Sequence, residues 1–131
     1  MRSLEEILRQ SRSIAIVGLS SDPARPSFGI AQALQKIGYQ IIPVNPKEKE
    51  VLGQTAYPSL LDIPGPVDLV NVFRRPNQTP EVARQAVQIR AQALWLQLGI
   101  ENEEAAQIAS AAGLDVVMDR CIMVEYRKLG L

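Results

Sequence analysis

The chain has 131 residues, of which 47% are hydrophobic and 21% charged, which suits one globular domain over residues 1–131. Its 14 Lys and Arg balance 14 Asp and Glu, so the formal net charge is zero and a basic nucleic-acid-binding surface is not expected. The chain has no histidine and one cysteine. This composition excludes Ser–His or Cys–His catalysis, phosphohistidine transfer, the usual zinc sites and internal disulfides.

The first residues, MRSLEEILRQSRS, carry acidic side chains and lack the apolar run of a signal peptide. No apolar stretch reaches the ~20 residues that cross a bilayer. A single unpaired cysteine is typical of a reducing compartment. We therefore expect a cytoplasmic protein that does not contact a membrane.

Hydrophobic periodicity predicts alternating strands and helices. The predicted strands are residues 13–18, 39–44, 67–73, 93–97 and 115–118. The predicted helices are residues 3–11, 28–37, 80–90 and 101–112, with a final helical turn or two at 122–129. Residues 52–63 are predicted to be irregular, with one helical turn at 59–62.

Several residues are expected to mark the ends of these elements. Ser3 and Glu6 fit a capping box, and Ser27 and Thr79 are expected to be N-caps. Gly38 and Gly113 are expected to end helices. Pro43 predicts that the second strand ends near a sheet margin or bends into a loop.

The alternation predicts an α/β fold, a Rossmann-like doubly wound sheet of five parallel strands with helices on both faces. The expected strand order is 3-2-1-4-5. Ligands of such sheets bind beyond the carboxyl ends of the strands, where the strand order reverses. That point is expected between strands 1 and 4.

The loop after the first strand, residues 18–29, reads GLSSDPARPSFG. Gly18 permits a tight turn, Ser20 and Ser21 offer donors, and Arg25 adds positive charge beside the helix start at Ser27. Helix N-termini and arginines favour phosphate or pyrophosphate. The loop matches neither G-x-G-x-x-G nor a P-loop, and the alternative interpretation is a solvated loop after a strand-ending glycine.

The second strand ends in Pro43-Val44-Asn45-Pro46, with no carboxylate before Glu48. A standard NAD site carries Asp or Glu near this position, so the pattern argues against one. A nucleotide could still lie against the apolar wall of Pro43, Val44 and Pro46.

Polar residues at later strand ends are weaker candidates. Arg74 and Arg75 follow the third strand and could meet a phosphate, although a surface pair neutralised by carboxylates is the alternative. Gln97 lies at the mouth of the fourth strand, whereas Trp95 is expected in the core. The charged run of residues 47–50, like the acidic pairs at 5–6 and 103–104, is interpreted as a solvated surface.

Cys121 follows Arg120 just after the fifth strand. A lone cysteine is usually a small buried hydrophobe, but a neighbouring cation favours the thiolate. Without a histidine partner, catalysis by Cys121 is not expected.

Taken in order, several stretches resemble the stand-alone CoA-binding domain proteins. Those proteins in turn resemble the CoA-binding domain of the succinyl-CoA synthetase alpha subunit and of ADP-forming acyl-CoA synthetases. The resemblance covers roughly residues 13–126. The stretches are VGLSS (17–21), PVNP (43–46), YPSL (57–60) with DIP (62–64), VD (67–68), VFR (72–74), WLQLGI (95–100), and VMDRC (117–121) with Glu125.

The resemblance implies coenzyme A as the ligand. It implies pyrophosphate on Gly18, Leu19, Ser20 and Ser21 and the following helix start. It also implies adenine near Pro43, Val44, Asn45 and Pro46, and pantetheine near Phe73, Arg74, Gln97 and Gly99. Leu19 departs from the alanine that relatives often carry. If Cys121 lies near the pantetheine end, a mixed disulfide with CoA under oxidation is a further hypothesis.

The synthetases use a phosphohistidine on a separate domain, and this chain has no histidine. The prediction is therefore a protein that binds CoA or an acyl-CoA without catalysis of its own. The alternatives are an NAD(P)-dependent oxidoreductase or redox sensor, and a CoA-binding subunit of a separate acyl-CoA-processing enzyme. A homo-oligomer is also open.

Overall fold

The computed structural model describes residues 1–131 and confirms the alternation of strands and helices. The helices are α1 Leu4–Gln10, α2 Pro26–Ile37, α3 Thr79–Gln88, α4 Glu103–Ala111 and α5 Ile122–Lys128. The strands are β1 Ser13–Val17, β2 Gln40–Val44, β3 Glu50–Val51, β4 Gln54–Thr55, β5 Leu69–Val72, β6 Ala93–Leu96 and β7 Asp115–Val117. Two 3-10 turns, η1 Leu60–Asp62 and η2 Pro76–Gln78, precede β5 and α3 respectively. No helix is long and apolar enough to span a bilayer.

Five strands form one parallel sheet in the order β2-β1-β5-β6-β7. Counted along the chain this order is 2-1-3-4-5, so the predicted order 3-2-1-4-5 is wrong. The third strand, β5, pairs with β1 and not with β2. The strand order therefore reverses between β1 and β5, and not between strands 1 and 4 as predicted.

The reason lies in the connection from β2 to β5. A right-handed crossover that returns past β1 must cross the face opposite α2. Leu60 of η1 packs on that opposite face, in the same cluster as residues of α3 and α4. Because this connection carries only a short 3-10 turn, its sequence has no amphipathic helical pattern to show which face it crosses.

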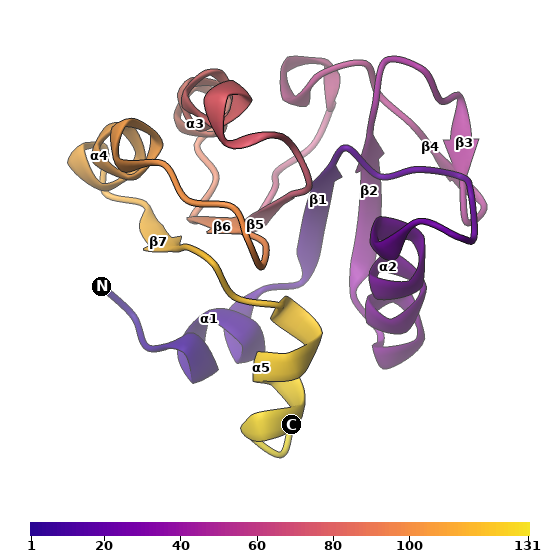
Figure 1. Ribbon diagram of the computed structural model, residues 1–131, viewed down its shortest axis with the longest axis horizontal. Coiled ribbons are helices and arrows are strands. Elements are labelled where there is room, and N and C mark those ends of the chain that lie inside the picture. The colour runs from indigo at the N-terminus through magenta and orange to yellow at the C-terminus, as the bar shows by residue number, and fades with distance from the viewer.

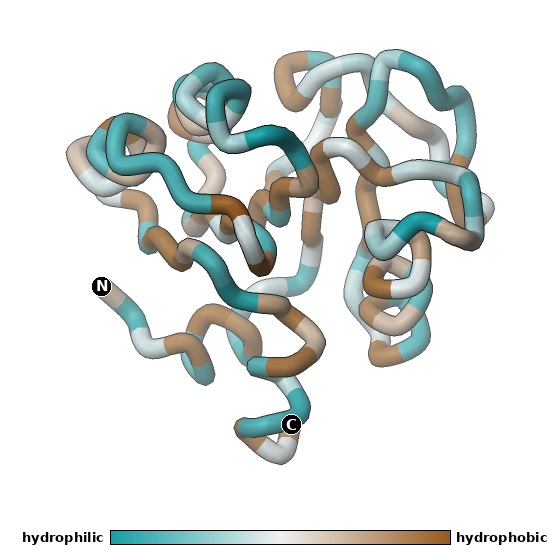
Figure 2. The backbone as a smooth tube through the Cα atoms, in the orientation of Figure 1, coloured by the Kyte–Doolittle hydropathy of each residue, from teal (hydrophilic) through white to brown (hydrophobic).

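Helices cover both faces of the sheet, as predicted (Figure 1). On one face α3, α4 and η1 pack on residues such as Val70, Val72 and Leu94. On the other face α1, α2 and α5 pack on residues such as Ile14 and Trp95. Hydrophobic residues concentrate along the strands between the two helix layers (Figure 2). Trp95 is fully buried, which confirms its predicted place in the core.

Strand β2 forms one edge of the sheet, which confirms the prediction from Pro43. The β3–β4 hairpin, not predicted from the sequence, lies beside this edge (Figure 1). Its turn residues, Leu52 and Gly53, have φ angles of 53° and 77°. A two-residue turn with both φ positive usually contains Asn-Gly or Asp-Gly, so Leu-Gly gave little signal.

Two of the predicted helix caps differ in the structure. Arg25 and Gln78 are the N-cap residues of α2 and α3, so Ser27 and Thr79 lie inside the helices and their predicted role as caps is wrong. Both side chains serve the preceding loops: the Ser27 Oγ accepts the Ser20 N–H, and the Thr79 Oγ1 donates to the Pro76 carbonyl.

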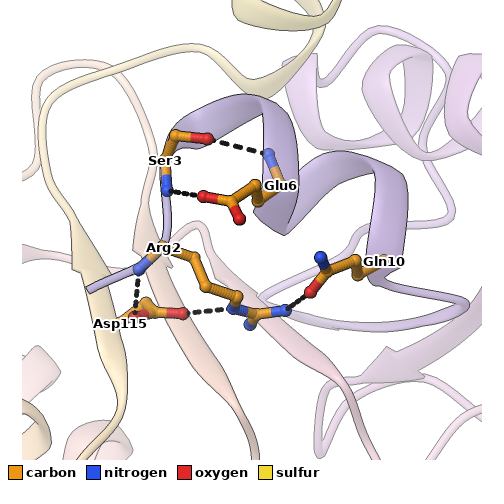
Figure 3. A network of polar contacts seen from close by, with 5 residues as sticks. All are labelled: Arg2, Ser3, Glu6, Gln10 and Asp115. Atoms are coloured by element: carbon orange, nitrogen blue, oxygen red, sulfur yellow. Dashed lines mark hydrogen bonds and ion pairs between the residues drawn. The ribbon is translucent and has the colours of Figure 1, made fainter.

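The N-terminal segment is fixed to the last strand of the sheet (Figure 3). The predicted capping box is present, with the Ser3 Oγ accepting the Glu6 N–H and the Glu6 carboxylate accepting the Ser3 N–H. The Arg2 Nε lies 2.6 Å from the Asp115 carboxylate, and Arg2 also donates to Gln10. The start of α1 is therefore anchored at the amino end of β7.

Candidate functional site

Gly18 lies where the carboxyl ends of three strands meet. Its N–H donates to the Val44 carbonyl at 2.8 Å, and the Phe73 N–H donates to the Val17 carbonyl at 2.8 Å. The φ of Gly18 is +88°, and a Cβ at this position would lie 2.3 Å from the Phe73 carbonyl oxygen. Only glycine fits this close approach of β1 and β5.

The loop from β1 to α2 (residues 18–25) is held by short hydrogen-bonded turns. The Ser20 N–H donates to the Ser27 Oγ at 3.1 Å, and the Asp22 N–H donates to the Ser20 Oγ at 3.0 Å. The Ala24 N–H donates to the Asp22 carboxylate at 2.9 Å. Serine and aspartate favour such local turns, which give the loop a defined shape.

A pocket of about 400 Å³ opens beside this loop, at the carboxyl ends of β1, β2 and β5. We call it the carboxyl-edge pocket. Its lining contains eight residues that the sequence predicted as ligand-binding: Gly18, Ser20, Arg25, Ser27, Asn45, Pro46, Phe73 and Arg74. Larger hollows lie at the opposite, amino edge of the sheet, but doubly wound sheets bind ligands at the carboxyl edge.

The carboxyl-edge pocket is positively charged although the chain is neutral. Arg25, Lys47 and Arg74 line it, and none of the three forms an ion pair within the chain. Arg74 is therefore not neutralised by a neighbouring carboxylate, which was the alternative interpretation from the sequence. Glu48 is the only acidic side chain in the lining. Three cations against one anion favour a ligand with more than one negative charge.

The N-terminus of α2 faces the same region. No side chain caps its N-terminal N–H groups, and its first turn has no acidic residue. The helix dipole therefore adds positive potential that no side chain of the turn offsets.

Three predicted residues surround the pocket without lining it. Leu19 is fully buried, and its carbonyl accepts the Asn45 Nδ2 at 3.0 Å. Val44 is also buried, and Ser21 is exposed with its N–H bonded to Glu48. Leu19 and Val44 thus belong to the core beside the pocket, and the predicted contact of Leu19 with a ligand stays a prediction.

The structure does not bring Gln97, Gly99 and Cys121 to the pocket. They follow β6 and β7, and β5 separates those strands from β1. The Gln97 Oε1 accepts the Ile122 N–H at 3.4 Å, and the Gly99 N–H donates to the Asp119 carboxylate at 2.7 Å. Cys121 is the half-buried N-cap residue of α5. Their predicted contact with the far end of a ligand stays a prediction.

The sequence did not identify Lys47 and Glu48 as site residues. Both belong to the charged run that was interpreted as a solvated surface. The Asn45 Oδ1 accepts the Lys47 N–H at 3.0 Å, and the Glu48 N–H donates to the Asn45 carbonyl. This turn folds residues 47 and 48 back toward the β1–α2 loop, and the Asn-Pro pair at 45–46 is the signal that could have indicated it.

Comparison with known proteins gives this pocket a family context. A family model described as a CoA binding domain matches residues 12–127. The chain belongs to this family of CoA-binding domains. The predicted family resemblance is thereby confirmed.

The individual relatives include proteins of similar length and a much longer ligase. The chain is 48% identical over 123 residues to the uncharacterized protein YneT of Bacillus subtilis, covering 94% of this chain and 91% of that protein. It is 35% identical over 79 residues to the ADP-forming acetate–CoA ligase II of Archaeoglobus fulgidus, covering 59% of this chain but only 12% of the ligase. A solved structure of a hypothetical protein from Pyrococcus horikoshii superposes with a TM-score of 0.95 at 41% identity, covering 98% of this chain and 90% of that one.

Proposed function

We propose that this protein binds coenzyme A or an acyl-CoA in the carboxyl-edge pocket and performs no chemistry of its own. The observation that carries this proposal is the union of Gly18, Arg25, Lys47 and Arg74 in one pocket of a CoA-binding-domain chain. The pyrophosphate would lie on the β1–α2 loop and the start of α2, where backbone donors and cations converge.

The same arrangement indicates where the adenine and the pantetheine arm of the ligand would lie. The adenine would lie against Asn45 and Pro46, next to the buried Val44. Arg74 stands beside Phe73, where the pantetheine arm would leave the pocket toward Gln97, Gly99 and Cys121. The absence of catalysis is proposed because the chain has no histidine to carry the phosphoryl group that the larger synthetases use.

Titration calorimetry with CoA tests the proposal, and Arg25→Ala sharpens it. Arg25 is exposed and makes no ion pair, so its loss should weaken CoA binding roughly 5–10-fold with little change in folding. Arg75→Ala is the matched control, because Arg75 is an exposed arginine on the same rim that does not line the pocket. No heat and no thermal shift at millimolar CoA would contradict the proposal.

A dinucleotide is the second candidate, and Glu48 favours it. The sequence argued against NAD because no carboxylate directly ends β2, yet the fold brings Glu48 to the pocket. NADH fluorescence in competition with CoA separates the candidates: displacement by micromolar NADH would favour the dinucleotide. Comparison of CoA with dephospho-CoA reports whether the 3′-phosphate is recognised.

A third possibility is that the protein supplies a CoA site to a separate acyl-transferring enzyme. The ADP-forming ligase of Archaeoglobus fulgidus, in which the matched region is a small part of a longer chain, motivates it. Such a role keeps the same pocket and adds a protein partner. Co-purification of an acyl-CoA-processing enzyme from cells is the observation that would distinguish it.

A further inference from the structure

Glu48 occupies an unusual position on a pocket wall that otherwise carries cations. Its Oε2 accepts the Ser21 N–H at 2.7 Å, although the two residues are 27 positions apart in the chain. The side chain is half-buried beside the β1–α2 loop. An anion therefore already lies on a donor of the loop that we expect to hold the ligand's phosphates.

The other bonded N–H groups of this loop have a different kind of partner. Ser20, Asp22 and Ala24 donate to side chains of the loop itself or of α2, and Gly18 and Arg25 donate to backbone carbonyls. These acceptors shape the loop and cannot leave without unfolding it. Glu48 comes from a separate loop, the one after β2, so it can move away while the β1–α2 loop keeps its shape.

A second contact between these two loops would survive this movement. The Asn45 Nδ2 donates to the Leu19 carbonyl at 3.0 Å and holds the base of the 45–49 loop. Glu48 lies three residues further along, where Lys47 and Lys49 are exposed. The Ala56 N–H donates to the Lys49 carbonyl and holds the other end of this loop, so the displacement needs only the Glu48 side chain to swing away from Ser21.

We propose that the Glu48 carboxylate is an autoinhibitory contact, an internal anion that takes the place of a ligand phosphate on the Ser21 amide. A phosphate group approaching this amide must displace the carboxylate, because two anions cannot share one donor without repulsion. The apparent affinity for any polyanion is then lower than the intrinsic affinity, in proportion to the fraction of molecules in which Glu48 is displaced. This inference rests on the proposed function, since the competing group is the ligand's phosphate.

The test compares Glu48→Gln with Glu50→Gln by calorimetry. Glutamine at position 48 keeps an acceptor for the Ser21 N–H but removes the charge. Glu50 on β3 is exposed and does not line the pocket, so its variant makes the same change in net charge nearby. We expect Glu48→Gln to lower the Kd for CoA and for inorganic pyrophosphate roughly 3–10-fold, and Glu50→Gln less than twofold. Adenosine, which has no phosphate, should bind equally to all three proteins.

The Ser21 amide resonance supplies a direct readout. In the free protein it should move on Glu48→Gln, whereas with saturating CoA it should coincide in wild type and variant. Unchanged or weaker binding of pyrophosphate to Glu48→Gln, or equal gains in both variants, would overturn the autoinhibitory contact. Wild-type protein that binds pyrophosphate but not CoA would overturn the proposed function alone. Failure of every variant to bind either pyrophosphate or CoA would overturn both.

Discussion

At the amino edge of the sheet, Asp68 and Asp115 accept hydrogen bonds from segments 55 or more positions away in the chain. At the carboxyl edge, Glu48 also bonds a distant backbone N–H, but on an exposed loop beside unpaired cations. The carboxylates at the amino edge join strands and the N-terminal segment. The carboxylate at the carboxyl edge joins two loops that a ligand can separate.

The two edges differ in whether a ligand can replace the carboxylate as a hydrogen-bond acceptor. The Asp68 carboxylate accepts the Arg12 and Ser13 N–H groups at 2.8 and 3.1 Å, and the Ser13 Oγ accepts the Asp68 N–H in return. This reciprocal pair fixes the starts of β1 and β5. At the carboxyl edge, a ligand's phosphate oxygens can accept the N–H that Glu48 releases. At the amino edge, we expect no ligand to take the place of the Asp68 carboxylate. Stability and binding are thus expected to be separable between the two edges.

The largest effect is expected from Gly18→Ala, the one change that should damage both properties. The added Cβ would meet the Phe73 carbonyl oxygen at a positive φ, which we expect to cost about 2–5 kcal/mol of unfolding free energy. CoA binding should be lost with it. Urea unfolding measures the first effect and calorimetry the second.

Gly53→Ala is the control for this variant, because Gly53 also has a positive φ but no atom lies within 4 Å of the added Cβ. It should cost about 1–2 kcal/mol and leave CoA binding intact. Equal losses in the two variants would contradict the role of the close contact at Gly18.

Asp68→Ala should destabilise the fold and leave the affinity for CoA unchanged. Two backbone N–H groups would lose their acceptor, which we expect to cost about 2–3 kcal/mol. Thermal and urea unfolding measure the loss, with the exposed Glu101→Ala as a matched control that removes one carboxylate. A Kd for CoA that rose more than threefold under native conditions would contradict the separation of the two edges.

Asp115→Ala should have a smaller effect, confined to the N-terminal segment. Asp115 holds the backbone N–H and the partly exposed guanidinium of Arg2, a contact worth about 1–2 kcal/mol (Figure 3). Hydrogen exchange should accelerate in α1 first. Exchange that accelerated equally in the β1–α2 loop would contradict a local role.

The smallest effect is expected from alkaline pH. Burial raises the pKa of Tyr39 to about 12, with Tyr126 adding to the shift, and the Tyr39 hydroxyl donates to the Leu8 carbonyl at the amino edge. A folded-state pKa above the ordinary value of about 10 favours the protonated form, so its stabilisation is complete below pH 10 and declines as pH rises through 12. Ultraviolet titration of tyrosinate should show a transition near pH 12 that disappears in Tyr39→Phe; its persistence would contradict the assignment.

The sequence predicted most local features because they depend on near neighbours. Gly18 stood out at the end of a buried strand, and Arg25 lay at the start of the next helix. The capping box at Ser3 and the core position of Trp95 were read from similar short patterns. These signals depend on spacing within a few residues.

The errors concern features that depend on distant segments. The strand order followed from the face crossed by η1, which its short turn did not reveal. The predicted order also placed the reversal point beside the fourth strand, which Gln97 and Gly99 follow, whereas in the structure β5 lies between that strand and β1. Glu48 was overlooked because its role depends on a turn that brings two loops together.

A titration of the isotopically labelled protein with CoA, followed through the backbone amide resonances, shows whether the ligand binds at the carboxyl edge of the sheet. We expect shifts concentrated at the carboxyl edge, in residues 18–27, 45–48 and 73–74. We expect the Asp68 and Asp115 amide resonances at the amino edge to stay in place. Shifts centred on the amino edge, or no shifts at millimolar CoA, would contradict binding at the carboxyl edge.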